Sequence, residues 1–429
     1  MRRNGLLILV VAALTMTVLS SAAFATNGYF SHGVGQKAKG MAGAGVAYPQ
    51  DALAAGINPA GMAFVGNRFD IGLEWFSPDR GSEIAGNDFP GVDAKYDAND
   101  KSNFFIPELG YNRMMNEAMA LGIAVFGRGG MNTAYTTPVP LFAGQEGTKA
   151  GVDLNQLYFV PNLAYMINEN HSIGVGIDIV YQWFKATGLQ NFDNDMMTSA
   201  PGKVTDNDNS TSFGAGVTVG WMGRFSPMIA AGLAYQSRAY MSEFDDYAGL
   251  FAEKGDFDIP PMLTGGFTLT PSERMVLALD IAQIWYSEVK SINNPLLPNL
   301  GMYQLGTENG AGFGWQDMTV YKLGVAFDPN EAWTLRGGYN YGEQPIPTSE
   351  TLFNILAPGV VESHLTLGAT WRLKPGMELT ASYMHAFEKE VKGENSIIPG
   401  QPDVGGMGGG EANLRMNQNS FGIALGLNL

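Results

Sequence analysis

The sequence predicts an all-β protein, a fourteen-stranded antiparallel transmembrane β-barrel with a small N-terminal hatch inside its lumen. Three observations predict this fold. Apolar and polar residues alternate with a period of two through fourteen stretches, short and long connections follow one another strictly, and aromatic residues gather at the ends of the stretches. Transmembrane barrels with an even number of strands share these features.

Residues 1–25 have the composition of a secretory signal peptide. Two arginines precede an uncharged run over residues 6–19, and Ala23, Phe24 and Ala25 form a small-residue cleavage site. The run is too short to cross a bilayer as a helix, and no later window of about 20 apolar residues occurs. We therefore expect cleavage after Ala25 and export of the remaining chain.

Residues 26–64 precede the first alternating stretch and are rich in glycine and alanine. A fourteen-stranded barrel is expected to be wider than the eight-stranded kind, whose side chains fill the interior, and narrower than water-filled porins. We expect this small segment to fold inside the lumen as a hatch, with a bend at Asn58, Pro59 and Ala60 that the proline stiffens. Glycines at inward-facing positions would leave room for it: Gly174, Gly176, Gly324, Gly338, Gly422 and Gly426.

Residues 65–429 are expected to form the barrel. In residues 377–387, for example, Leu379, Ala381 and Tyr383 alternate with polar neighbours, so one face of the strand is apolar. Most stretches exceed the roughly 9 to 11 residues with which a tilted strand crosses a membrane. The stretches are residues 65–76, 101–114, 117–135, 152–167, 171–187, 210–223, 226–241, 256–270, 274–287, 315–328, 331–344, 361–373, 376–391 and 415–429.

The connections predict the topology. Tight turns rich in Asn, Pro, Gly and charged residues alternate with seven long loops. Barrels carry short periplasmic turns on one rim and long external loops on the other, so both termini are expected to be periplasmic. Two aromatic belts are predicted at the membrane interfaces, with Trp75, Tyr135 and Tyr286 in the outer belt and Trp371 in the inner one. A soluble β-sandwich does not explain the loop alternation together with the belts.

Composition narrows the function. The formal net charge is −16, which argues against nucleic acid as a partner, and the chain has no cysteine, so disulfides do not hold the fold. We expect the outer membrane of a Gram-negative bacterium as its location, outer-membrane lipid and the barrel assembly machinery as partners, and a monomeric state.

Four segments carry a family resemblance: Asn58-Pro59-Ala60, "YAGLFAEKGDFDIP" from Tyr247, "LALDIAQIWYSEVKSI" from Leu277 and "WTLRGGYNYGEQPIP" from Trp333. Together they resemble the FadL/TodX family of outer-membrane transporters for long-chain fatty acids and aromatic hydrocarbons. The resemblance implies a fourteen-stranded barrel, an N-terminal hatch and a kinked third strand that opens the wall sideways. Members usually end in an aromatic residue that aids assembly, whereas this chain ends in Leu429.

Apolar clusters in three outer loops predict capture of a hydrophobic small molecule, a fatty acid or a hydrocarbon. They are residues 247–251, with Tyr247, Leu250 and Phe251 as candidate ligand contacts, 296–305 and 352–356. Exposed apolar patches often mark binding surfaces. The alternative is that the loops simply pack on one another as a cap.

A buried ligand carboxylate would require a cationic partner. Lys37 and Lys39 in the hatch and Arg128 in the third stretch are the candidates. Gly127, Gly129 and Gly130 surround Arg128, and such a cluster weakens a strand and marks a bulge or bend. With the kink that the resemblance implies, these glycines are the candidate lateral gate.

Catalysis has little support in the sequence. Of four histidines, only His364 lies where it could serve a lumenal Ser-His dyad, and its neighbour Ser363 points to the opposite face. We expect no catalytic residues, no metal and no cofactor. The expected function is an outer-membrane diffusion channel for hydrophobic compounds, with a general porin or an outer-membrane lipase or protease as alternatives.

Overall fold

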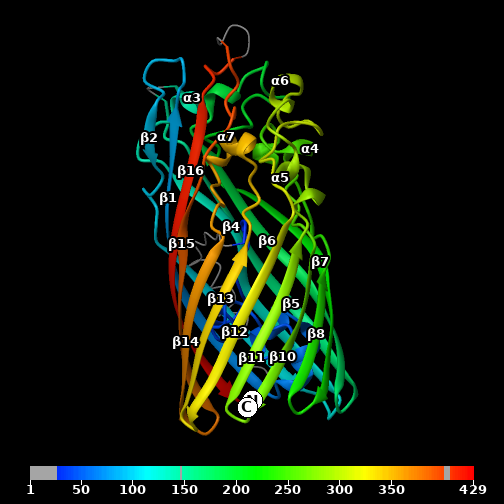
Figure 1. The fold of residues 1–429 in the computed structure, drawn as a ribbon. Coiled ribbons are helices and arrows are strands. Elements are labelled where there is room, and N and C mark those ends of the chain that lie inside the picture. The colour runs from blue at the N-terminus through cyan, green and yellow to red at the C-terminus, as the bar shows by residue number, and fades with distance from the viewer. Residues whose placement is uncertain (1–26, 145–146, 401–405) are drawn as a thin grey trace.

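The structure is a computed structural model that describes residues 27–144, 147–400 and 406–429. The expected signal peptide, residues 1–25, lies outside the described residues. Fourteen antiparallel strands pair in chain order, and β16 pairs again with β1, which closes the sheet into a barrel (Figure 1). The predicted fold class is therefore confirmed.

The fourteen barrel strands are β1 Arg68–Ala85, β3 Phe104–Met114, β4 Met119–Ala134, β5 Gly151–Asn168, β6 His171–Thr187, β7 Ser210–Ser226, β8 Ile229–Gln236, β10 Met262–Ser272, β11 Met275–Ile284, β12 Met318–Asn330, β13 Trp333–Gly342, β14 Ser363–Lys374, β15 Met377–Val391 and β16 Glu411–Asn428. Two short strands, β2 Ala94–Asp97 and β9 Tyr240–Met241, add to β1 and β7.

Short helical turns lie in the N-terminal segment and the long loops. They are α2 Gln36–Lys39, η1 Ala52–Gly56, η2 Pro59–Phe64, α3 Pro140–Ala143, η3 Gln190–Phe192, η4 Asp245–Tyr247, α4 Ala252–Gly255, η5 Tyr286–Glu288, α5 Lys290–Asn293, α6 Asn299–Met302, η6 Thr348–Glu350 and α7 Thr351–Asn354. No helix among the described residues is long and apolar enough to cross a membrane.

Each predicted stretch overlaps one barrel strand, but several bounds differ, and two of the differences have a local physical reason. The stretch 226–241 breaks after Gln236, where the Ser237 hydroxyl accepts a hydrogen bond from Val217 N at 3.0 Å in place of a backbone ladder bond. The stretch 256–270 begins as a strand only at Met262. Pro260 and Pro261 come directly before it and have no N–H for the ladder.

The outer surface of the barrel is apolar, as the alternation predicts. Successive outward positions such as Ile173, Val175 and Ile177 are exposed, whereas the intervening residues face inward. Trp75 and Trp371 also lie on the outer surface. The assignment of two other aromatic residues to the outer belt is wrong: Tyr135 and Tyr286 are fully buried.

Tyr135 and Tyr286 are buried because each hydroxyl binds a backbone carbonyl inside the molecule. Tyr135 donates to Ile355 O at 2.8 Å, in the loop between β13 and β14, and Tyr286 donates to Asn27 O at 2.5 Å. A buried tyrosine hydroxyl requires such a partner. These residues hold a loop and the N-terminal segment instead of contacting headgroups.

Residues 27–64, the N-terminal segment, lie inside the barrel (Figure 1, blue) and are almost entirely buried. Inward-facing glycines of the wall make this possible. A Cβ on Gly174 would come within 2.4 Å of Ala60 N, and one on Gly338 within 2.5 Å of the Met41 carbonyl carbon. Gly324 and Gly422 contact Met41 and Gln36 in the same way, so four of the six predicted glycines accept this segment.

Candidate functional site

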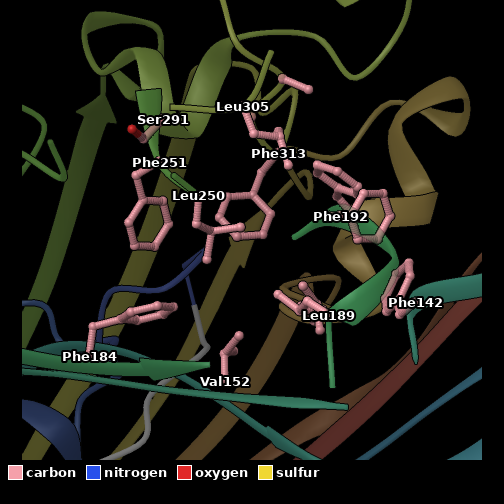
Figure 2. A pocket seen from close by; sticks show the side chains of 14 residues that line it. Phe142, Val152, Phe184, Leu189, Phe192, Leu250, Phe251, Ser291, Leu305 and Phe313 are labelled. Atoms are coloured by element: carbon pink, nitrogen blue, oxygen red, sulfur yellow. The ribbon is translucent and has the colours of Figure 1, made fainter. Parts of the chain in front are cut away.

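An apolar cavity of about 30 Å³ lies beneath the long loops (Figure 2). All three apolar clusters singled out in the sequence contribute to it. Leu250 and Phe251 come from the first cluster, Leu305 from the second, and Phe353 and Leu356 from the third. These clusters therefore converge on one cavity, and they also pack as a cap.

Tyr247 stands behind this cavity rather than in its lining. Its ring packs on Phe184 with centroids 4.8 Å apart, and its hydroxyl donates to Asn207 O at 2.8 Å. Burial raises the pKa of this hydroxyl to about 12. Tyr247 thus positions Phe184, which does line the cavity.

Four further aromatic residues of the lining, Phe142, Phe184, Phe192 and Phe313, were not predicted. Phe192 also lines a broad open groove on the loop surface, with Phe89, Leu141 and Met196 among its other lining residues. Phe192 therefore lies between the groove and the apolar cavity. A single phenylalanine in a polar loop stretch such as "LQNFDND" gives little signal in sequence.

A series of ring contacts leads from the apolar cavity down to the N-terminal segment. Phe251 contacts Phe257 at 4.9 Å between centroids, Phe257 contacts Tyr29 at 6.1 Å, and Tyr29 contacts Phe30 at 4.8 Å. Phe30 in turn lies under the guanidinium of Arg128, 5.6 Å from its ring centroid. The aromatic path therefore ends at a cation.

Arg128 and Lys322 line a second pocket, together with Phe30, Ser31 and Thr264. Neither cation forms a salt bridge with any carboxylate in the described part of the chain. Arg128 approaches Gly56 O at 3.4 Å, and Lys322 donates to His32 O at 3.1 Å. This pocket offers two positive charges beside apolar surface.

Lys322 was not predicted, although the sequence holds a signal for it. Val320, Gly324 and Ala326 occupy inward-facing positions of β12. Lys322 lies at the same alternate positions, between the outward-facing Tyr321 and Leu323. A lysine at an inward position of a strand is a lumen residue by alternation alone.

Lys37 and Lys39, the predicted hatch cations, form salt bridges with the barrel wall. Lys37 pairs with Glu378 of β15, and Lys39 pairs with Glu74 of β1. The Lys37 ammonium also donates to Gln50 O at 3.0 Å. Both ammonium groups are therefore occupied by carboxylates of the wall in this structure.

Three more wall carboxylates bind backbone N–H groups of the N-terminal segment. Asp70 accepts from Ala52 N at 2.9 Å, and Glu108 accepts from Gln36 N at 3.1 Å. Asp280 accepts from both Gly45 N and Val46 N, at 2.7 and 2.9 Å. Such charge-assisted bonds are stronger than neutral ones. With Glu74 and Glu378, five acidic side chains of the wall hold this segment in place.

Asn58, Pro59 and Ala60 form the start of η2. The Asn58 side-chain oxygen accepts from Ala60 N at 3.1 Å, which caps the turn. Its amide donates to Val46 O at 2.7 Å and to Trp221 O at 3.0 Å. One asparagine thus caps a turn, links two parts of the segment and ties them to β7.

The predicted gate region contains a bulge. The register of β4 with β5 runs from Gly127 opposite Leu157 to Gly129 opposite Gln156, which leaves Arg128 unpaired in this ladder. On its other side, β4 pairs with β3 only as far as Phe126 opposite Glu108. Beyond that point β4 pairs with the N-terminal segment instead of with β3. Ser31 N donates to Arg128 O at 2.7 Å, and Gly130 N donates to Tyr29 O at 3.1 Å.

His364 is fully buried on β14, and its ring stacks on His32 with centroids 6.3 Å apart. Ser363 is not its partner, because the Ser363 hydroxyl accepts a hydrogen bond from Tyr339 instead, at 2.9 Å. Within the part of the chain that the structure describes, no group of three or more potential metal ligands occurs.

Comparison with curated proteins finds two bacterial relatives. The chain is 23% identical over 427 residues to the long-chain fatty acid transport protein of Escherichia coli O6:H1 strain CFT073, covering 90% of this chain and 92% of that protein. It is also 23% identical to the long-chain fatty acid transport protein of Salmonella typhi, over 89% of this chain and 92% of that one.

Solved structures share the fold. The Pseudomonas putida toluene transporter TodX matches with a TM-score of 0.68 and 17% identity, covering 93% of this chain and 99% of that chain. A Pseudomonas aeruginosa FadL homologue matches with a TM-score of 0.68 and 17% identity, covering 94% and 99%. The model of the outer membrane protein transport protein family (OMPP1/FadL/TodX) matches residues 11–428. This chain, with its closed barrel and filled lumen, therefore belongs to that family of outer-membrane transport proteins and is not an enzyme.

Proposed function

We propose that the protein is a diffusion channel that takes up long-chain fatty acids or related hydrocarbons by loop capture, lumenal binding and lateral exit at β4. The observation that carries this proposal is the aromatic path from the loop cavity to the Arg128 pocket. The rings form an unbroken apolar series that ends where a carboxylate would find positive charge. Phe257 and Tyr29 are fully buried, so rings of this series move apart when an acyl chain passes. The names of the relatives agree with this substrate class.

Capture begins at the loop surface. The open groove brings Met196, Met197 and Met407 together with aromatic and aliphatic residues. Flexible thioether side chains adapt to apolar ligands of different shape. From the groove, a ligand passes Phe192 into the cavity lined by Leu250 and Phe251. Each methylene group that leaves water contributes about 0.8 kcal/mol.

We assign the ligand carboxylate to Arg128 and Lys322. Both line one pocket and lack carboxylate partners in the described residues, whereas Lys37 and Lys39 already hold wall glutamates. A buried cation without a counter-charge is costly, and a bound carboxylate removes that cost. We therefore assign Lys37 and Lys39 to anchoring.

Lateral exit is proposed at the glycine-rich bulge, Gly127, Gly129 and Gly130, where the β3–β4 ladder ends. An acyl chain leaving there enters the bilayer without crossing the periplasm. Residues 26–64 act as a hatch in this proposal, residues 1–25 as the signal peptide and residues 65–429 as the barrel. Both termini face the periplasm, and the barrel assembly machinery inserts the chain as a monomer.

Binding measurements with palmitate and cetyl alcohol, which share a chain length and differ in charge, test the proposal. Changing both Arg128→Ala and Lys322→Ala should weaken palmitate binding about tenfold or more, because each charged hydrogen bond contributes roughly 1.5–3 kcal/mol. Cetyl alcohol affinity should stay within about twofold. Arg113→Ala, an exposed arginine of β3, is the matched control.

Equal palmitate affinity in the double variant and the parent would refute the assignment of the carboxylate site. Absence of binding of either compound to the parent protein would refute the proposed function itself. A large, steady ion current through the parent protein in single-channel recordings would favour the porin alternative instead.

A further inference from the structure

The wall between β3 and β4 lacks a ladder over part of its height. Pairing ends at Phe126 opposite Glu108, while β4 continues to Ala134. The loop before β3 meets β4 again only at its end, where Ala134 N donates to Ala98 O at 3.2 Å and Asp100 N donates to Ala134 O at 3.0 Å. Between these two points the strand edges are not joined by β3–β4 backbone bonds.

Arg80 of β1 bridges this interval. Its guanidinium donates to the backbone carbonyl of Asn132 on β4 and to that of Lys101, just before β3. A further bond reaches the Asn132 side-chain oxygen at 3.0 Å. Arg80 is 0% exposed, and its guanidinium lies 5.8 Å from the ring centroid of Phe104. One side chain thus joins the two edges that the ladder leaves apart.

The guanidinium has neutral partners only. Arg80 forms no salt bridge with a carboxylate among the described residues, and its Nε has no hydrogen-bond partner. Hydrogen bonds between an arginine and a carboxylate are stronger than those to neutral carbonyls and are often bidentate. A buried arginine bound only to carbonyls is therefore open to exchange with an anion.

Cavities lie on both sides of this bridge. The inner one is lined by Arg80 with Tyr29, Met131, Trp315 and Met416, an apolar and aromatic set. The cavity measures about 10 Å³, so it has to widen before an acyl chain can lie against this apolar lining with its head group at Arg80.

The outer cavity is polar. Lys101, Lys149, Asp153 and Lys185 line it, and Asn132 lines both cavities. Asn132, which accepts hydrogen bonds from Arg80, thus lies between the two cavities.

We propose that Arg80 is a latch on the β3–β4 opening, closed by its bonds to Asn132 and Lys101 and released by the carboxylate of an outgoing amphipathic ligand. This inference rests on the proposed function, because it concerns the exit step of that transport. It assigns to one residue both the closure of the wall and a preference for anionic over neutral ligands at the exit.

Thiol labelling tests the latch without transport. Met131 lines the inner cavity and is 3% exposed, and the chain has no native cysteine, so Met131→Cys places a single thiol behind the latch. We expect slow reaction with a hydrophilic maleimide in the otherwise unchanged protein. Adding Arg80→Met should accelerate labelling about tenfold, since the hydrogen bonds that close the wall are lost.

Arg415→Met is the matched control, because Arg415 lies on β16 and is half-exposed. Arg80→Gln serves as a second variant that keeps one donor group, and heat-dependent migration in gels confirms that each barrel is folded. Equal labelling rates with and without Arg80 would overturn the latch.

Ligand dependence separates a latch from a purely structural arginine. Palmitate should accelerate labelling of the Met131→Cys protein, whereas cetyl alcohol should not, and Arg80→Gln should abolish the difference. If both compounds accelerate labelling, release by a carboxylate is overturned. The same holds if palmitate binds but neither compound accelerates labelling. If palmitate does not bind at all but Arg80→Met still accelerates labelling, the proposed function fails and the closure of the wall by Arg80 stands.

Discussion

Asp256 is a side chain whose environment makes the loops sensitive to pH. It lies between η4 and β10, beside Asp258, outside the barrel strands. Arg238 donates a hydrogen bond to Asp258 at 2.6 Å but stays 3.7 Å from Asp256. Burial, and next the charge of Asp258, raise the pKa of Asp256 to about 7.

The sign of the effect follows from linkage. The folded loop binds this proton more tightly than an unfolded chain does, so the stabilisation is present at low pH and is lost as pH rises through about 7. Protease resistance of residues 237–261 should therefore fall between about pH 4 and 7 and level off above that. Asp256→Asn should remove most of this pH dependence, while Asp245→Asn, at an exposed position, should not. Identical pH profiles for all three proteins would contradict the prediction.

Single residues also show which features of the site the sequence could predict and which it could not. Alternation is enough to place Arg128 and His364 inside the lumen, and it would have placed Lys322 there too. The carboxylate partners of Lys37 and Lys39 were not predictable in this way. Those contacts depend on how the N-terminal segment folds and on the register of strands far away in the chain.

Among the elements, η2 depends most on one residue. Asn58→Ala removes the cap and both tethers of its amide, whereas Asn58→Ser retains an oxygen that can cap the turn. If tethering to Val46 and Trp221 holds the segment, both variants should increase the frequency of channel openings in planar bilayers. If capping matters more, only the alanine variant should do so. Unchanged recordings from both would show that the wall carboxylates suffice.

The strands themselves were predictable because a period of two runs through most of them. The ends of the strands were less predictable. β1 runs on to Ala85 because it pairs with β16 and β2 beyond the membrane, and no change of pattern in the sequence marks that extension. The apolar clusters of the loops could be identified in the sequence. Their convergence on one cavity could not, because only the closed barrel brings these distant loops together.

At the scale of the whole molecule, the lumen is filled by the N-terminal segment, which five carboxylates of the wall hold in place. Removing residues 27–64 would leave the five wall carboxylates without their partners in that segment: Asp70, Glu74, Glu108, Asp280 and Glu378. The truncated barrel should conduct ions and favour cations, because rings of acidic side chains select for them. Reversal potentials in a potassium chloride gradient measure this. Anion selectivity or an unchanged, closed channel would contradict it.

The same acidic wall constrains the order in which the molecule is made. Arg68 and Asp70 lie at the start of β1, Glu378 near the start of β15, and β16 closes the ring between these two strands. Lys37 reaches this seam from inside. In an empty cylinder Arg68 would be the shared counterion of Asp70 and Glu378, and the charge that Lys37 adds at this seam would be missing. The last two strands therefore close most favourably around a segment already inside, and the N-terminal residues act as an internal template for assembly as well as a filling.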